Sequence, residues 1–133
     1  MSQVKALLGG RRTTYDGGLV LHWSPGEIRA VFRNGRSQGV RYEIGLDEVE
    51  LVSTVATRGV LDALGRDRVA EEILVRNRLA EVVRFSIGKY SRLEASCSHR
   101  LSTLQPEELR FYVAVLAREA DRLEYLLTGK DEH

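Results

Sequence analysis

The chain has 133 residues, of which 43% are apolar and 29% are charged. This length and composition predict one folded domain, residues 1–133, with a core too small to surround a large ligand as well. The formal net charge of +1 argues against a strong general binder of polyanions, which would carry a large basic excess. The charge is nevertheless uneven, because residues 1–46 carry seven Lys or Arg against three Asp or Glu.

The only cysteine is Cys97, which excludes an intrachain disulfide and a thiolate metal site. The first ten residues lack the basic start and the long apolar run of a signal peptide. No apolar stretch approaches the ~18 residues that a membrane-spanning helix needs. These features predict a cytoplasmic protein that does not enter a membrane.

The first half of the chain predicts a short helix followed by an antiparallel meander. Residues 2–8 favour a helix, and residues 9–14 favour a flexible basic connector. Apolar alternation predicts strands at residues 19–23, 27–33, 40–44 and 49–55. Pro25 and Gly26 have the chemistry of a type II turn, and Asn34 with Gly35 forms a strong hairpin signal.

The second half predicts helix, hairpin and helix. Residues 60–64 and 67–80 have helical patterns, with Gly65 as a kink or cap between them. Residues 82–87 and 92–97 form the hairpin, and residues 104–127 form one long helix. Because the strands are grouped apart from the helices, we expect an α+β fold: an antiparallel sheet, built from the N-terminal meander and the C-terminal hairpin, packed by helices.

The long helix at residues 104–127 carries two apolar surfaces. One stripe is expected to cover the sheet, and it consists of Leu109, Tyr112, Val113, Leu116, Ala120, Leu123 and Leu127. Phe111, Val115 and Leu126 lie on the opposite side, beside Arg118 and Arg122. We hypothesise that this second surface binds a partner protein or a second copy of the chain. In the alternative, the N-terminal segment or the helix at residues 60–80 covers it within the monomer.

A second candidate surface is basic and lies on the meander. It is a groove or basic patch formed by Trp23, Arg29, Arg33, Arg36 and Arg41, with Tyr42 nearby. Basic groups interleaved with aromatic rings can hold single-stranded nucleic acid through phosphate contacts and stacking. In the alternative, the arginines form ion pairs with Glu27 and Glu43 across neighbouring strands. Trp23, Ile28 and Phe32 are expected to pack in the core or to face a groove.

No group of residues predicts catalysis, a metal site or a cofactor. Cys97 and His99 are two residues apart, which is neither a catalytic nor a zinc-binding spacing. The acidic cluster of Asp47, Glu48 and Glu50 could imitate a site for a hard cation, but a solvated strand face explains it better. We therefore expect a protein that is not an enzyme.

Several segments between residues 77 and 124 carry a family resemblance. They are NRL at 77–79, VVRFSI at 82–87, RLEA at 92–95, LQPEEL at 104–109 and AREADRLE at 117–124. With these segments the chain resembles the YbjN family and the related type III secretion chaperone-like proteins over about half of its length. The resemblance implies a small α+β domain without enzymatic activity.

Type III secretion chaperones are generally homodimers, and their substrates wrap around them in extended form. The resemblance therefore implies a homodimeric, chaperone-like adaptor that binds an extended segment of a partner protein, in the cytosolic role of the YbjN-like group. The alternative function is a nucleic-acid-associated protein. It would act directly through the arginine-rich meander or through a partner that binds nucleic acid.

Overall fold

The computed structural model describes residues 3–79 and 82–129, and it confirms the predicted α+β fold. Within these residues seven antiparallel strands form one sheet in the order β1-β2-β3-β4-β5-β7-β6. The strands are β1 (Arg12–Tyr15), β2 (Leu19–Ser24), β3 (Glu27–Val31), β4 (Ser37–Ile44), β5 (Glu48–Ala56), β6 (Arg84–Ile87) and β7 (Leu93–Arg100). The helices are α1 (Gln3–Leu8), α2 (Arg58–Leu64), α3 (Arg66–Leu79) and α4 (Pro106–Thr128). Single 3-10 turns lie at η1 (Asp16–Gly18), η2 (Lys89–Ser91) and η3 (Leu101–Thr103).

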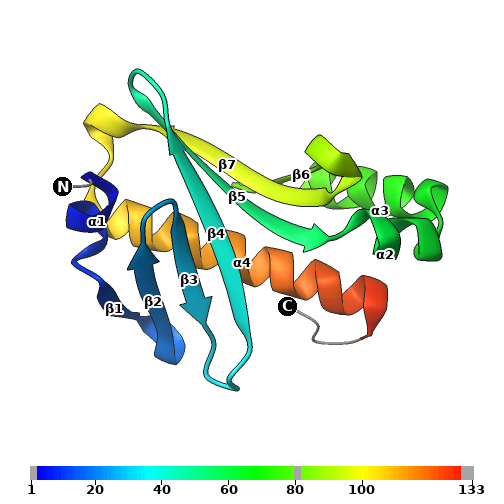
Figure 1. Cartoon of the computed structure of the whole chain (residues 1–133), viewed down its shortest axis with the longest axis horizontal. Helices are drawn as coiled ribbons and strands as arrows, with labels where there is room; N and C mark the ends of the chain where they lie inside the picture. The colour runs from blue at the N-terminus through cyan, green and yellow to red at the C-terminus, as the bar shows by residue number, and fades with distance from the viewer. Residues whose placement is uncertain (1–2, 80–81, 130–133) are drawn as a thin grey trace.

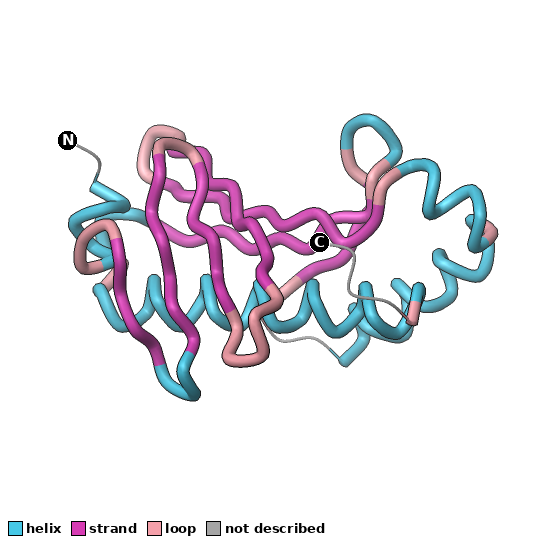
Figure 2. The backbone as a smooth tube through the Cα atoms, turned by 60° about the horizontal axis from the view of Figure 1, so that its bottom comes forward, coloured by secondary structure: helices cyan, strands magenta, loops and turns pink. Residues whose placement is uncertain are grey.

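The long helix α4 lies along one face of the sheet (Figure 1). It packs against β3, β4, β5 and β7, and α1 contacts it near its first turns (Figure 2). The helices α2 and α3 lie together at the other end of the sheet, where α3 packs against β6. The core therefore lies between α4 and one face of the sheet.

Alternation of apolar and polar residues along the strands explains why one face of the sheet is buried and the other is exposed to solvent. Ile28 on β3, Leu51 on β5 and Leu93 on β7 are fully buried on the face that α4 covers. Their neighbours Arg29 and Glu50 point to the opposite face and are exposed. This period of two is the pattern expected of an antiparallel sheet with one covered face.

The ends of α4 are set by local sequence. Pro106 occupies the first turn, where the missing N–H has no intrahelical partner to lose. The side chains of Gln105 and Glu108 form a reciprocal capping box, and Gly129 ends the helix in the left-handed conformation with φ 69°. The whole stripe predicted to cover the sheet does so, with six members buried and Tyr112 partly buried.

The turn and helix predictions are largely confirmed. Gly26 has the positive φ, 82°, that the third position of a type II turn requires. Gly65 caps α2, so the predicted helical segments are two helices. The predicted end residues Ser2 and Ala80 lie outside the described residues.

The prediction of a flexible connector at residues 9–14 is wrong. Arg12–Tyr15 forms the edge strand β1, with Thr13 opposite Leu21 of β2, so the meander has five strands rather than four. The hydroxyl of Thr13 also donates to the carbonyl of Leu8 at 2.9 Å. The segment was missed because an edge strand has few buried positions and needs no apolar alternation.

We predict that the two faces of α4 differ sharply in their contribution to stability. Leu116 is fully buried while Leu126 is 50% exposed on the same helix. Leu116→Ala should lower the free energy of unfolding by about 2–5 kcal/mol because it leaves a cavity. Leu126→Ala should change it by less than ~0.5 kcal/mol. Urea denaturation measures both, and equal effects would contradict the assignment of the two faces.

Candidate partner-binding surface

The second surface of α4 is present as one continuous stripe along the helix. Successive residues of an α-helix are rotated by about 100°, so these side chains fall within a sector about 100° wide. We call this set the exposed stripe of α4: Phe111, Val115, Arg118, Arg122, Tyr125 and Leu126. Phe111, Tyr125 and Leu126 are 43%, 51% and 50% exposed, whereas Val115 is partly buried against the core.

The N-terminal segment covers part of this side of α4. The carbonyl of Leu8 accepts a hydrogen bond from Arg110 at 3.3 Å, and the carbonyl of Asp16 accepts one from Arg118 at 2.9 Å. Phe111, which lies between these two contacts along the helix, and Leu126, which lies beyond them, remain exposed. The alternative of complete cover within the monomer therefore does not apply to the described residues.

A hollow of about 450 Å³ lies between the C-terminal half of α4 and the turn that joins β3 to β4. We call it the α4 hollow, and it is lined by Phe32, Arg36, Arg118, Asp121, Arg122, Tyr125 and Leu126. Residues from both surfaces predicted from the sequence therefore line the same hollow. Arg118, Arg122 and Leu126 come from α4, and Phe32 and Arg36 come from the meander.

An ion pair between Arg36 and Asp121 lies in the lining of the α4 hollow. The Asp121 side chain is only 8% exposed and that of Arg36 is 29% exposed, so the pair is largely withdrawn from water. Arg36 also lies over the ring of Tyr125, with 6.0 Å between the guanidinium carbon and the ring centroid. This contact joins the β3–β4 turn to α4 and orients Tyr125.

Asp121 and Tyr125 line the α4 hollow but were not among the residues predicted from the sequence. Tyr125 lies on the same helical sector as Phe111 and Leu126, so a complete helical projection could have found it. Asp121 carries no such signal, because its partner Arg36 is 85 residues away in the sequence.

Two arginines of the exposed stripe form a positive rim. Arg118 is held by the carbonyl of Asp16, and its guanidinium lies 6.0 Å from the ring centroid of Tyr15. A carbonyl bears no full charge, so the charge of Arg118 is not neutralised there. The side chain of Arg122 is 66% exposed and approaches Glu119 at 3.9 Å, a contact that water screens strongly.

The meander residues do not form one basic and aromatic patch. Arg29 pairs with Glu27 on the same strand at 2.7 Å, and Arg41 pairs with Glu94 on β7 at 2.8 Å. The expected pairing of Arg41 with Glu43 is therefore replaced by a contact that reaches across the sheet.

Trp23 lies on the face of the sheet opposite Arg29 and Arg41, as the strand register shows. Its indole N–H donates to the hydroxyl of Tyr42 at 2.8 Å, and it packs against the core. Ile28 is fully buried, Phe32 is partly buried at the α4 hollow, and Arg33 is exposed. Core packing thus accounts for Trp23 and Ile28.

Cys97 and His99 share a face of β7, because this strand continues to Arg100. Burial raises the pKa of the Cys97 thiol to about 11, so the thiol is protonated at neutral pH. The His99 ring stacks on Tyr112 at a centroid distance of 3.5 Å. Burial lowers the pKa of His99, and the negative charge of Glu108 acts in the opposite direction. This arrangement offers no activated nucleophile.

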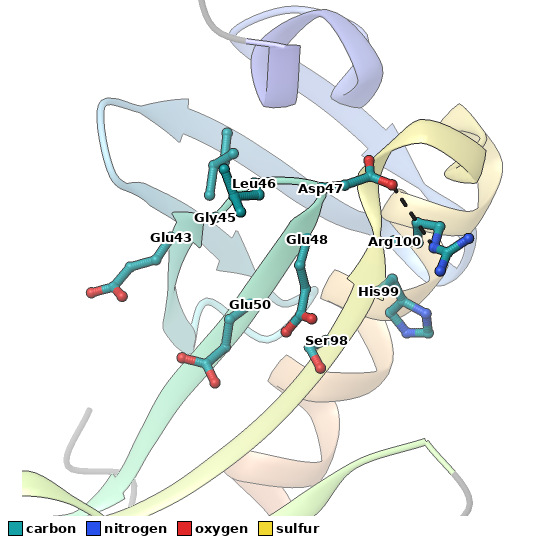
Figure 3. Close-up of a pocket in the computed structure, with 10 residues that line it drawn as sticks. Glu43, Gly45, Leu46, Asp47, Glu48, Glu50, Ser98, His99 and Arg100 are labelled. Atoms are coloured by element: carbon teal, nitrogen blue, oxygen red, sulfur yellow. Dashed lines mark ion pairs between the residues drawn. The ribbon is translucent and has the colours of Figure 1, made fainter.

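The acidic cluster lines a second hollow, of about 680 Å³, at the β4–β5 turn (Figure 3). Glu43, Glu48 and Glu50 are exposed on the open face of the sheet, and Glu43 is directly opposite Glu50. Asp47 points elsewhere and accepts hydrogen bonds from the backbone and hydroxyl of Ser102 at 2.9 and 2.8 Å. Within residues 3–79 and 82–129 no group of three or more potential ligands is arranged to hold a metal ion.

Helix α3 exposes apolar side chains on the face away from the sheet. Val69 is buried on its inner face, and the amide of Asn77 exchanges two hydrogen bonds of 2.8 Å with the backbone of Phe85. Leu74 and Val75 are 66% and 51% exposed on the outer face. This exposed apolar pair on α3 was not predicted from the sequence, and it lies apart from the exposed stripe of α4.

Comparison with solved structures identifies the fold. A chain of the ExsC–ExsE complex superposes with a TM-score of 0.58 and 15% identity, over 94% of this chain and 93% of that one. The second match is a chain of the complex between the Yersinia pestis type III secretion chaperone SycH and a fragment of YscM2. It superposes with a TM-score of 0.52 and 13% identity, over 91% of this chain and 99% of that one. This chain has the fold of a type III secretion chaperone.

A third match to this chaperone fold is a chain of the ExoU–SpcU heterodimer from the type III secretion system of Pseudomonas aeruginosa. It gives a TM-score of 0.53 and 16% identity, over 79% of this chain and 85% of that one. No model of a protein family matches the chain, and no curated protein matches it in sequence. The likeness is therefore one of fold, and the resemblance to the YbjN family stays a prediction.

The helices of the described residues include none that is both long enough and apolar enough to span a membrane.

We predict that Cys97 resists alkylation in the folded chain. A pKa about two units above that of a free thiol leaves about 100-fold less thiolate, and burial limits access further. Iodoacetamide should therefore modify the native chain at least about 100-fold more slowly than the urea-unfolded chain. Mass spectrometry over time measures both rates, and similar rates would show a reactive thiol.

Proposed function

We propose that the chain is a non-enzymatic, chaperone-like adaptor that acts in the cytoplasm and binds an extended segment of a partner protein. The exposed stripe of α4 carries this proposal, because Phe111 and Leu126 are 43% and 50% exposed at its two ends. The α4 hollow beside the stripe adds a concave surface. The neighbouring structures support the proposal, since chains of this fold have been solved in complexes with other proteins.

The dimensions of the stripe suit an extended segment. Phe111 and Leu126 are separated by about 22 Å along the helix axis, at 1.5 Å per residue. An extended chain rises about 3.3 Å per residue, so about seven residues span this distance. Alternate side chains of such a segment could contact the apolar ends of the stripe without the segment folding first.

Homodimer formation is part of the proposal, and α3 offers the surface for it. Leu74 and Val75 are the exposed apolar pair on its outer face, opposite the buried Val69. A second copy placed on this face would remove both side chains from water. This arrangement leaves the exposed stripe of α4 free for the partner protein.

We predict that an affinity pull-down from host lysate retains one or a few proteins through the exposed stripe. Replacing Phe111 and Leu126 by Ser should lower the captured amount at least about tenfold, because the apolar anchors are lost. Quantitative mass spectrometry gives the readout, and nuclease treatment should leave the capture unchanged.

The matched control replaces Ile44 and Leu46 by Ser. These two apolar residues lie at the β4–β5 turn and are 45% and 109% exposed, outside the stripe. This variant should capture the same proteins as the wild type. If the Phe111 and Leu126 variant captured as much protein as the control variant, the binding surface would lie elsewhere. Loss of capture on nuclease treatment would favour the nucleic-acid function.

We also predict that light scattering gives twice the 15.0 kDa mass of the chain at micromolar concentration. Leu74→Asp with Val75→Asp should yield the monomer, because two carboxylates would be buried against their own copies. The Phe111 and Leu126 variant should remain dimeric. A wild-type mass of 15.0 kDa would show that the homodimer part of the proposal is wrong.

A further inference from the structure

The α4 hollow is positively charged although the chain as a whole is nearly neutral. Among the described residues its lining contains Arg36, Arg118 and Arg122 but a single carboxylate, that of Asp121. Asp121 is already bound by Arg36 in the lining of the hollow. The charge of Arg118 is therefore left at the rim, together with that of Arg122, whose only nearby carboxylate among the described residues is that of Glu119, in a water-screened contact of 3.9 Å.

These two guanidinium groups are placed for an anionic ligand. Arg118 and Arg122 are four residues apart, so they lie on the same side of α4 about one turn apart. Arg118 is fixed by the carbonyl of Asp16 and by the ring of Tyr15, which lowers the entropy lost when it binds. A guanidinium can hold a carboxylate through two parallel hydrogen bonds.

The same hollow has an apolar lining next to the charges. Phe32 lies on one side, and Tyr125 and Leu126 lie on the other, both about half exposed. A volume of about 450 Å³ falls within the range of about 300–1,000 Å³ that small-ligand pockets occupy. The lining thus suits an apolar side chain with negative charge close beside it.

We infer that the α4 hollow binds an acidic segment of the partner protein, in which one aromatic or large aliphatic side chain is flanked by Asp or Glu. This inference rests on the proposed function and adds the chemistry of the partner. The apolar residue enters between Phe32 and Leu126, while the flanking carboxylates contact Arg118 and Arg122. A nucleic acid fits this site less well, because two guanidinium groups at the rim of a partly apolar hollow offer few contacts to a run of phosphates.

The test is a selection of random peptides, displayed on phage, against the full-length chain. The enriched peptides should be rich in Asp and Glu around Phe, Tyr, Trp, Leu or Ile. A synthetic peptide of the enriched sequence should bind by fluorescence anisotropy, and its affinity should fall as salt is raised because the contacts are partly exposed. Arg118→Glu with Arg122→Glu should weaken it at least about tenfold.

The charge-matched control is Arg58→Glu with Arg84→Glu, two exposed arginines on α2 and β6. This control changes the net charge by the same amount as the Arg118 and Arg122 variant, and it should bind the peptide as the wild type does. Arg122→Gln alone, at a position that is 66% exposed, should weaken binding without affecting the fold, which circular dichroism checks.

Four results would overturn the inference, and the first two separate it from the proposed function. Enriched peptides that are basic or uncharged, or that bind the Arg118 and Arg122 variant as well as the wild type, would refute the acidic partner and leave the adaptor function standing. Binding of a single-stranded oligonucleotide that depends on the same two arginines would assign the site to nucleic acid. If no peptide were enriched, the result would count against both the acidic partner segment and the adaptor function.

Discussion

The packing of α4 on the sheet is the constraint on which the rest of the structure depends. At 23 residues the helix is about 35 Å long, and seven strands about 4.8 Å apart make a sheet about 29 Å wide. One helix can therefore extend across the sheet, provided that it buries an unbroken apolar stripe. Because α4 forms an outer layer, its opposite side stays at the surface, where Phe111 and Leu126 are exposed.

The contact between Arg36 and Asp121 turns this exposed side into a shaped surface. It draws the β3–β4 turn against α4 and leaves a hollow between them, with Tyr125 under the Arg36 guanidinium. The same pair neutralises the carboxylate of Asp121, so the remaining arginines at the rim set the sign of the charge. The pairing of Arg36 with Asp121 thus affects both the shape and the charge of this surface.

Local signals in the sequence predicted much of the fold. The stripe of α4 that covers the sheet, the turn at Gly26 and the break at Gly65 each depend on short-range periodicity or on backbone conformation, and all three are confirmed. The strand β1 was missed because its side chains are polar, and its stability comes from pairing with β2. The α4 hollow could not be predicted, because tertiary packing alone joins Arg36 to Asp121.

Hydrogen–deuterium exchange of the chain, alone and with its captured partner, tests most directly whether the exposed stripe is the binding surface. The account predicts slower exchange at the β3–β4 turn, where the backbone N–H groups of Arg36 and Gly35 lie, and along α4 from Phe111 to Leu126. The open face of the sheet near Glu48 should exchange as in the free chain. Slower exchange at Glu48 and no change along α4 would contradict the account.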